Sequence, residues 1–131
     1  MSKVLNQSAA EPDYDRLLRA NLQRVFNEHD PDLRRAAIAE LFAAEPIMYE
    51  PGAVVVGQEA IAEVAGRLLD QFGPDFTFVA IGSGLGHHGV GSLRWKAGKA
   101  DGSDIVTGID TAEVRDGRIA RLWVLLDTPP A

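Results

Sequence analysis

The stretch over residues 104–127 constrains the fold most, because it has the pattern of one long β-hairpin. Asp116 and Gly117 form an Asp-Gly dipeptide between two apolar runs, which is the strongest short-range signal for a hairpin turn. With a two-residue turn, Arg115 faces Arg118, and the pairing of all residues further from the turn follows from that register.

This predicted register places a single carboxylate, Asp110, within an apolar face of the hairpin. A buried charge without a partner is costly, so such an acid is protonated, paired or functional. Both faces are apolar at the end away from the turn, which predicts that both are covered there. The predicted pairs are Val114 with Ile119, Ala112 with Arg121, Asp110 with Trp123 and Gly108 with Leu125, and the face of Asp110 also carries Val106, Val114, Ile119, Trp123 and Leu125.

Apolar residues recur at helical spacing in three segments that precede the strands of the C-terminal half. The first segment covers residues 12–26. The second starts at residue 30, where an N-cap aspartate precedes a proline, and it carries Phe42 in its buried stripe and ends before Pro46. The third lies within residues 57–73, between two glycines, and a proline follows it.

The remaining segments have the pattern of strands. Short strands are predicted over residues 47–50 and 53–56. A longer strand begins at Phe76, a turn follows over residues 82–86, and another strand covers residues 86–96 before the long hairpin. This order predicts an α+β arrangement in which three helices pack on one face of a curved, mostly antiparallel sheet.

Length and charge limit the possible classes of protein. The 131 residues fit a flexible N-terminal segment, residues 1–12, followed by one domain over residues 13–131. A net charge of -6 without a basic stripe argues against a nucleic-acid partner. No run approaches the ~20 apolar residues of a membrane span. The absence of cysteine excludes disulfides and thiolate chemistry. We therefore expect a cytoplasmic protein with no membrane partner.

Two stretches and the order of elements carry a family resemblance that extends from residue 14 to residue 127. Residues 42–52 read Phe-Ala-Ala-Glu-Pro-Ile-Met-Tyr-Glu-Pro-Gly, and residues 108–119 read Gly-Ile-Asp-Thr-Ala-Glu-Val-Arg-Asp-Gly-Arg-Ile. The chain resembles the nuclear-transport-factor-2-like superfamily, which includes SnoaL-like polyketide cyclases and ketosteroid isomerases. The resemblance implies a cone in which the helices and a strongly curved sheet enclose a deep apolar pocket. It also implies a homodimer formed through the convex face of the sheet.

Glu50 and Asp110 are the two candidate catalytic carboxyl groups. By resemblance, Glu50 is similar in position to the proton-shuttling aspartate of ketosteroid isomerases, and Asp110 to the second aspartate, which donates a hydrogen bond to a developing oxyanion. A carboxylate near a substrate C–H can act as a base, and a carboxyl kept neutral by an apolar site can donate to a carbonyl oxygen. The pair predicts an isomerase, dehydratase or cyclase. The alternative is a module of the same fold that binds a small ligand without turnover.

His87 is the third candidate catalytic residue, since in the predicted strand over residues 86–96 it shares a face with Trp95. The adjacent His88 lies on the other face, so the two histidines cannot ligate one metal ion from a regular strand. Residues 84–89 match a dinucleotide fingerprint by letter, but a strand follows them where a helix is required. We therefore predict neither a metal nor another cofactor.

Large apolar side chains around these candidates indicate an apolar or aromatic small-molecule ligand. The predicted ligand-binding residues are Phe26, Met48, Phe78, Trp95 and Trp123.

The chain departs from the families that it resembles at two positions. Asn21 and Leu22 occupy the region in which the isomerases carry a tyrosine, and Gly108 stands where epoxide-hydrolase-like members carry an arginine.

Overall fold

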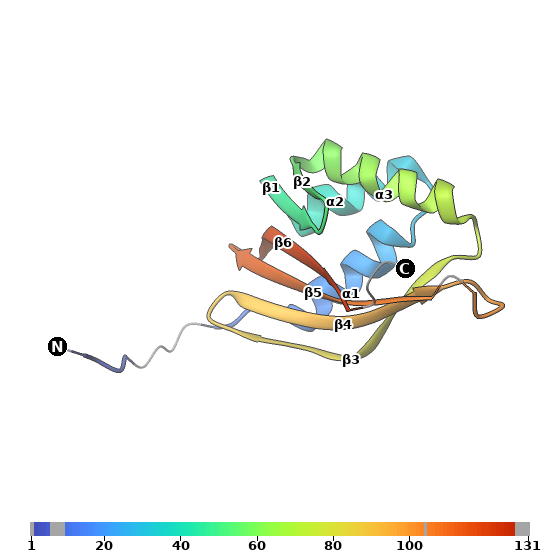
Figure 1. The fold of residues 1–131 in the computed structure, drawn as a ribbon. Helices are drawn as coiled ribbons and strands as arrows, with labels where there is room; N and C mark the ends of the chain where they lie inside the picture. The colour runs from blue at the N-terminus through green and yellow to red at the C-terminus, as the bar shows by residue number, and fades with distance from the viewer. Residues whose placement is uncertain (1, 6–9, 104, 128–131) are drawn as a thin grey trace.

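The computed structural model describes residues 2–5, 10–103 and 105–127, and it has the predicted α+β class (Figure 1). The helices and two strands precede residue 73, and the elements described after it are all strands. The elements in order are α1 (Tyr14–Asn21), the π-helical turn η1 (Leu22–Phe26), α2 (Pro31–Leu41), β1 (Phe42–Glu50), β2 (Ala53–Val56), α3 (Gln58–Phe72), β3 (Thr77–His87), β4 (Val90–Gly98), β5 (Val106–Arg115) and β6 (Arg118–Leu126).

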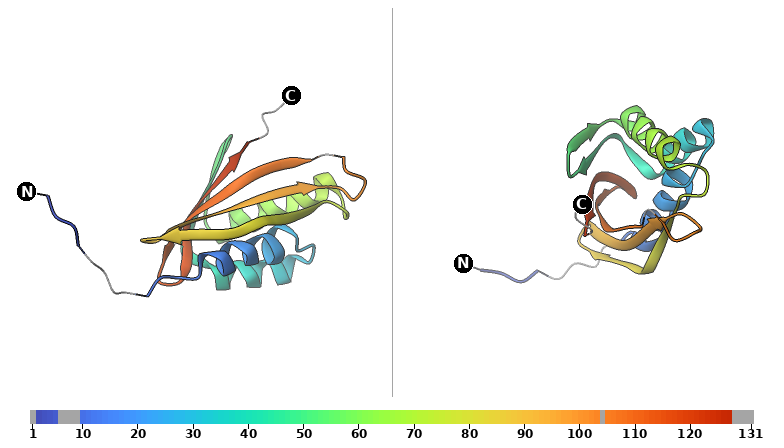
Figure 2. Two further views of the ribbon diagram at one scale, coloured as in Figure 1. Left: turned by 90° about the horizontal axis from the view of Figure 1, so that it is seen from below. Right: turned by 45° about the vertical axis from the view of Figure 1, so that its right-hand side comes forward.

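The described strands form one mixed sheet in the order β2-β1-β6-β5-β4-β3. β1 and β6 run parallel, and every other neighbouring pair is antiparallel. The helices lie on one side of β3 to β6, and no helix or strand that the structure describes covers the other side of these strands (Figure 2). The core lies between the helices and the sheet and includes Leu18, Val25, Ile38, Phe42, Met48, Ile61, Leu93, Ile119 and Leu122.

The second helix begins at its predicted capping residue, and the first helix begins within its predicted segment. Asp13 caps α1, and its carboxylate accepts a hydrogen bond from the backbone N–H of Arg16 at 3.0 Å. Asp30 caps α2 by accepting from the backbone N–H of Asp32 at 2.8 Å, and Pro31 is the first helical residue. Each cap satisfies an N–H group that the helix itself leaves unpaired.

The prediction that Phe42 continues the second helix is wrong. α2 ends at Leu41, and Phe42 begins β1 in an extended conformation, paired with Ile119 of β6. The side chain is fully buried. An apolar residue at this junction fits the buried stripe of the helix and the buried face of the strand equally well, so periodicity alone does not locate the boundary.

The prediction of a turn over residues 82–86 is also wrong. β3 continues through these residues, and the hairpin turns at His88 and Gly89. These two residues have positive φ angles of 52° and 85°, as a two-residue primed turn requires. The earlier glycines serve a close approach of α1 instead. The N–H of Gly84 donates to the carboxylate of Asp15 at 2.7 Å, and a Cβ at this glycine would lie 2.8 Å from the Cα of that residue.

The long hairpin has its predicted turn, and Arg115 pairs with Arg118 as expected. Beyond the next pair, β6 contributes one extra residue, Ala120, so the register shifts by one. Because side chains alternate between faces, this bulge exchanges the faces of the rest of β6. Trp123 therefore lies on the face opposite Asp110. The corrected pairs are Glu113 with Arg121, Ala112 with Leu122, Asp110 with Val124 and Gly108 with Leu126.

Candidate active site

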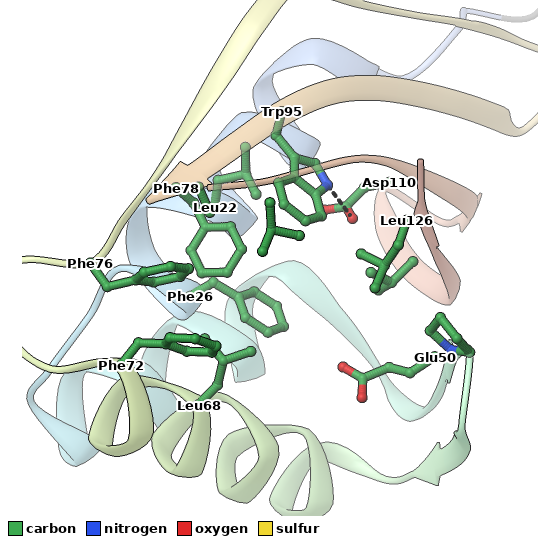
Figure 3. Close-up of a pocket in the computed structure, with 14 residues that line it drawn as sticks. Leu22, Phe26, Glu50, Leu68, Phe72, Phe76, Phe78, Trp95, Asp110 and Leu126 are labelled. Atoms are coloured by element: carbon green, nitrogen blue, oxygen red, sulfur yellow. Dashed lines mark hydrogen bonds between the residues drawn. The ribbon is translucent and has the colours of Figure 1, made fainter. Parts of the chain in front are cut away.

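A cavity of about 230 Å³ lies between the helices and the inner face of the sheet (Figure 3). Its lining is almost entirely apolar, and two carboxyl groups, those of Glu50 and Asp110, interrupt it. Such a lining with few polar groups is typical of sites for small organic molecules. The other lining residues are Leu22, Phe26, Pro51, Leu68, Phe72, Phe76, Phe78, Trp95, Ala97, Val106, Val124 and Leu126.

Aromatic rings form a continuous wall on one side of this cavity (Figure 3). The ring of Phe76 stacks on Phe72 with centroids 4.4 Å apart. Phe78 contacts Phe76 edge to face at 5.6 Å and Trp95 at 5.2 Å. Phe26 packs against the same ring of Phe78 at 5.8 Å. Offset and edge-to-face rings stabilise one another and present a rigid apolar surface to a ligand.

Asn27, which follows η1, holds the end of that turn against this wall. Its side-chain amide donates to the carbonyl oxygen of Phe78 at 2.8 Å, and the carbonyl of the same side chain accepts from the N–H of Phe78 at 2.7 Å. The preceding turn η1 is π-helical, with the N–H of Asn27 bonded to the carbonyl of Leu22 at 2.9 Å. Leu22 and Phe26, at the two ends of η1, both line the cavity. π-helical turns occur frequently at functional sites.

Asp110, on β5, is the buried acid of the site. Its side chain is 3% exposed, and its Oδ1 accepts a hydrogen bond from the indole Nε1 of Trp95 at 2.9 Å. Loss of hydration raises the pKa of Asp110 from 3.8 to about 7. The Trp95 hydrogen bond and the amide of Asn21 oppose this rise, and the charge of Glu50 adds to it. Near neutral pH, Asp110 is therefore present in both protonation states.

Glu50 is the last residue of β1, just before Pro51, and its side chain extends into the cavity (Figure 3). It is partly buried, and burial raises its pKa above 4.5. The site thus combines one fully buried carboxyl with one that is less buried. The difference in environment suits two roles, a base at Glu50 and a neutral hydrogen-bond donor at Asp110.

The structure brings together five of the eight predicted site residues. Glu50, Asp110, Phe26, Phe78 and Trp95 all line the cavity.

Three other predicted site residues lie outside the lining. Met48 is fully buried in the core. Trp123 stacks on Tyr49 with centroids 5.1 Å apart, on the face that the register shift assigns to it. His87 is exposed at the end of β3, where its Nδ1 lies 2.9 Å from that of His88, so its predicted place in the cavity is wrong. The reason is the hairpin turn, which puts His87 on β3 instead of on the strand of Trp95.

The sequence interpretation missed three parts of the site. Phe72 and Phe76 are absent from the predicted ligand-binding residues, although they flank the helix stop at residues 73–74 and line the cavity. Trp95 was expected only as a lining residue, yet it is the hydrogen-bond donor to Asp110. Asn21 entered the sequence analysis only because it lies where the isomerases carry a tyrosine. Its burial next to Asp110 depends on how α1 meets β5, which no local pattern encodes.

Within the described residues, no group of three or more histidine, aspartate and glutamate side chains converges as a metal site would require. No helix in that part of the chain combines the length and the apolar character that crossing a membrane requires.

The chain has the NTF2-like, or cystatin-like, fold, and solved structures described in these terms match it. The model of the SnoaL-like domain matches residues 18–122. The chain therefore belongs to the SnoaL-like family. A comparison with curated protein sequences found no match.

Similar solved structures include a protein from Agrobacterium tumefaciens proposed to be an isomerase of the SnoaL-like family. It is 26% identical, the alignment covers 88% of this chain and 97% of that one, and the TM-score is 0.80. A proposed SnoaL-like polyketide cyclase from Jannaschia is 14% identical over 95% of this chain and all of the other, with a TM-score of 0.69. A proposed polyketide cyclase from Sinorhizobium meliloti is 19% identical over 83% and 93% of the two chains, with a TM-score of 0.67.

Proposed function

We propose that this protein is an enzyme of the isomerase, dehydratase or cyclase type that acts on an apolar or aromatic small molecule carrying a carbonyl group. One observation carries the proposal: two carboxyl groups in unlike environments, those of Glu50 and Asp110, open onto the same apolar cavity. In this proposal the helices and the sheet enclose the ligand as a cone. The SnoaL-like isomerase proposed for Agrobacterium tumefaciens supports the same class of reaction.

In the proposed reaction, Glu50 acts as the base. Its ionised carboxylate takes a proton from the carbon next to the ligand carbonyl, and the electron pair of the broken C–H bond moves toward the carbonyl oxygen. Neutral Asp110 donates a hydrogen bond to that oxygen as negative charge develops on it. Return of the proton to a different carbon completes an isomerisation. In a dehydration, protonated Glu50 gives its proton to a β-hydroxyl group, which leaves as water while the electron pair of the enolate forms the C=C bond.

The activity is testable with 2-tetralone, an aromatic ketone whose α-protons exchange in D2O. We expect the wild-type protein to catalyse this exchange, and Glu50→Gln to slow it by about 100-fold or more because the base is lost. Asp110→Leu should slow it by about 100-fold because the oxygen loses its donor, whereas Asp110→Asn retains an N–H donor and should lose less. Proton NMR follows the exchange.

Glu45→Gln is the matched control, since Glu45 is an exposed glutamate on the same strand as Glu50. This variant should exchange 2-tetralone at the wild-type rate. Saturable binding of 2-tetralone with no catalysed exchange in the wild type would contradict the enzyme proposal and make the protein a binding module.

We also propose that the protein forms a homodimer through the face of the sheet that the helices leave uncovered. Exposed apolar side chains support this, among them Leu125 at 50% and Val90 at 46% exposure. An apolar surface of this kind is typical of a protein interface.

Sedimentation velocity should give twice the 14.1 kDa chain mass for the wild type. Leu125→Lys should give the mass of one chain. Leu33→Lys, at an exposed leucine on α2, is the control and should remain dimeric.

A further inference from the structure

Asn21 is a polar side chain in the core whose hydrogen-bonding groups have no partner. It is the last residue of α1 and is 0% exposed. Neither its Nδ2 nor its Oδ1 forms a hydrogen bond. An unpaired buried amide costs free energy, and most buried polar groups in proteins are paired. The position of Asn21 therefore needs a reason other than packing, since a leucine branches at the same carbon and has no polar group to leave unpaired.

The reason lies in its neighbour. The amide of Asn21 is close enough to the carboxyl of Asp110 to favour the ionised acid, although no atom of the amide is in hydrogen-bond geometry. Trp95 already donates to Oδ1 of Asp110, and Glu50 of β1 is the charged group that acts on it from another element. Asn21 thus approaches Asp110 from the helix layer, and Trp95 approaches it from the neighbouring strand.

The chemistry of an amide differs from that of other neighbours an acid can have. A carboxylate needs a donor, and a neutral carboxylic acid also needs an acceptor for its proton. A lysine or arginine would serve only the ionised acid, and a leucine would serve neither form. An asparagine carries a donor and an acceptor on one group, and a half-turn about its last bond exchanges them. It can therefore follow the acid through a change of protonation.

We propose that Asn21 is a positioning residue that acts through Asp110, turning its amide so that Nδ2 donates to the carboxylate and Oδ1 accepts from the neutral acid. In the present structure the amide forms neither of these hydrogen bonds. This coupling between the Asn21 amide and the protonation of Asp110 involves only these two side chains. Its importance for turnover rests on the proposed function, because the coupling sets the pH range over which Asp110 can donate to a ligand carbonyl.

The test is a titration of the Asp110 carboxyl carbon by 13C NMR in the wild-type protein and in Asn21→Leu. Loss of the amide donor should raise the pKa of Asp110 by about one pH unit, since a hydrogen bond to a charged group has this strength. Asn21→Leu should melt at or above the wild-type temperature under acidic conditions, because it removes an unpaired polar group. Leu18→Val, at a buried apolar residue of the same helix, is the control and should leave the titration unchanged.

A second measurement needs no variant. In the wild type, the side-chain 15N–H2 resonances of Asn21 should shift with pH at the same midpoint as the carboxyl carbon of Asp110. An unchanged Asp110 titration in Asn21→Leu, or Asn21 resonances that do not follow pH, would overturn the inference. Saturable binding of 2-tetralone without exchange in the wild type would instead contradict the proposed function and leave this coupling standing.

Discussion

Asp110→Asn should stabilise the protein by about 4 kcal/mol at pH 8 and change its stability little at pH 4. The pKa of Asp110 is about 7 in the folded protein, against 3.8 for the unperturbed group. Between these values the unfolded chain has released the proton and the folded protein retains it. Rising pH therefore favours the unfolded state across this window, and above it the full cost of a buried carboxylate remains. Asparagine has nearly the same shape and never bears this charge.

The measurement is the free energy of unfolding by urea across this pH window for both proteins. The difference between them isolates Asp110, because all other titrating groups are shared. Asp75→Asn, at an exposed aspartate, is the control. Its free energy of unfolding should change with pH in the same way as that of the wild type. A constant difference between wild type and Asp110→Asn across the window would show that Asp110 titrates normally. The same ionisation should reduce 2-tetralone exchange by the wild type as pH rises through about 7, and Asp110→Asn should lack this loss.

The architecture could be predicted from the sequence wherever a local signal decided it. The cap at Asp30 and the turn at residues 116–117 each satisfy backbone groups through a short-range pattern, and the structure confirms both. The errors occur where tertiary contacts decide. Phe42 joins β1 because β6 is available to pair with it. β3 continues through residues 82–86, with an irregularity in its pairing between Ile81 and Leu85, where α1 packs against it.

The candidate site shows the same division. Asp110 could be identified because a lone acid among apolar residues is visible in the sequence, and Glu50 through a family resemblance. The partner of Asp110 could not be identified, because the bulge at Ala120 leaves no mark in the apolar pattern and moves Trp123 to the other face. Trp95 reaches Asp110 across a strand pairing, which is known only once the register of β4 and β5 is known.

Trp95 can reach Asp110 because the residue that it faces across the ladder has no side chain. Trp95 pairs with Gly108, while Asp110 pairs with Leu93 one step further along the same face. A Cβ at Gly108 would lie 2.7 Å from Cζ2 of the Trp95 ring and 2.5 Å from the carbonyl oxygen of Leu125. The second contact is with backbone, which cannot move without disturbing the pairing of β5 and β6. The glycine therefore gives the indole the space in which it lies.

Gly108→Ala should lower the free energy of unfolding by about 3 kcal/mol, because the new methyl group overpacks this position. It should also displace the indole and remove its hydrogen bond to Asp110, so the pKa of that acid should rise further. Urea unfolding gives the first effect. Tryptophan emission in a Trp123→Phe background reports the environment of Trp95 alone, and 13C NMR reports the acid. Gly52→Ala is the control, since nothing lies within 4 Å of its Cβ position. Wild-type stability and emission in Gly108→Ala would contradict the role assigned to this glycine and weaken the case that the Trp95–Asp110 contact organises the cavity.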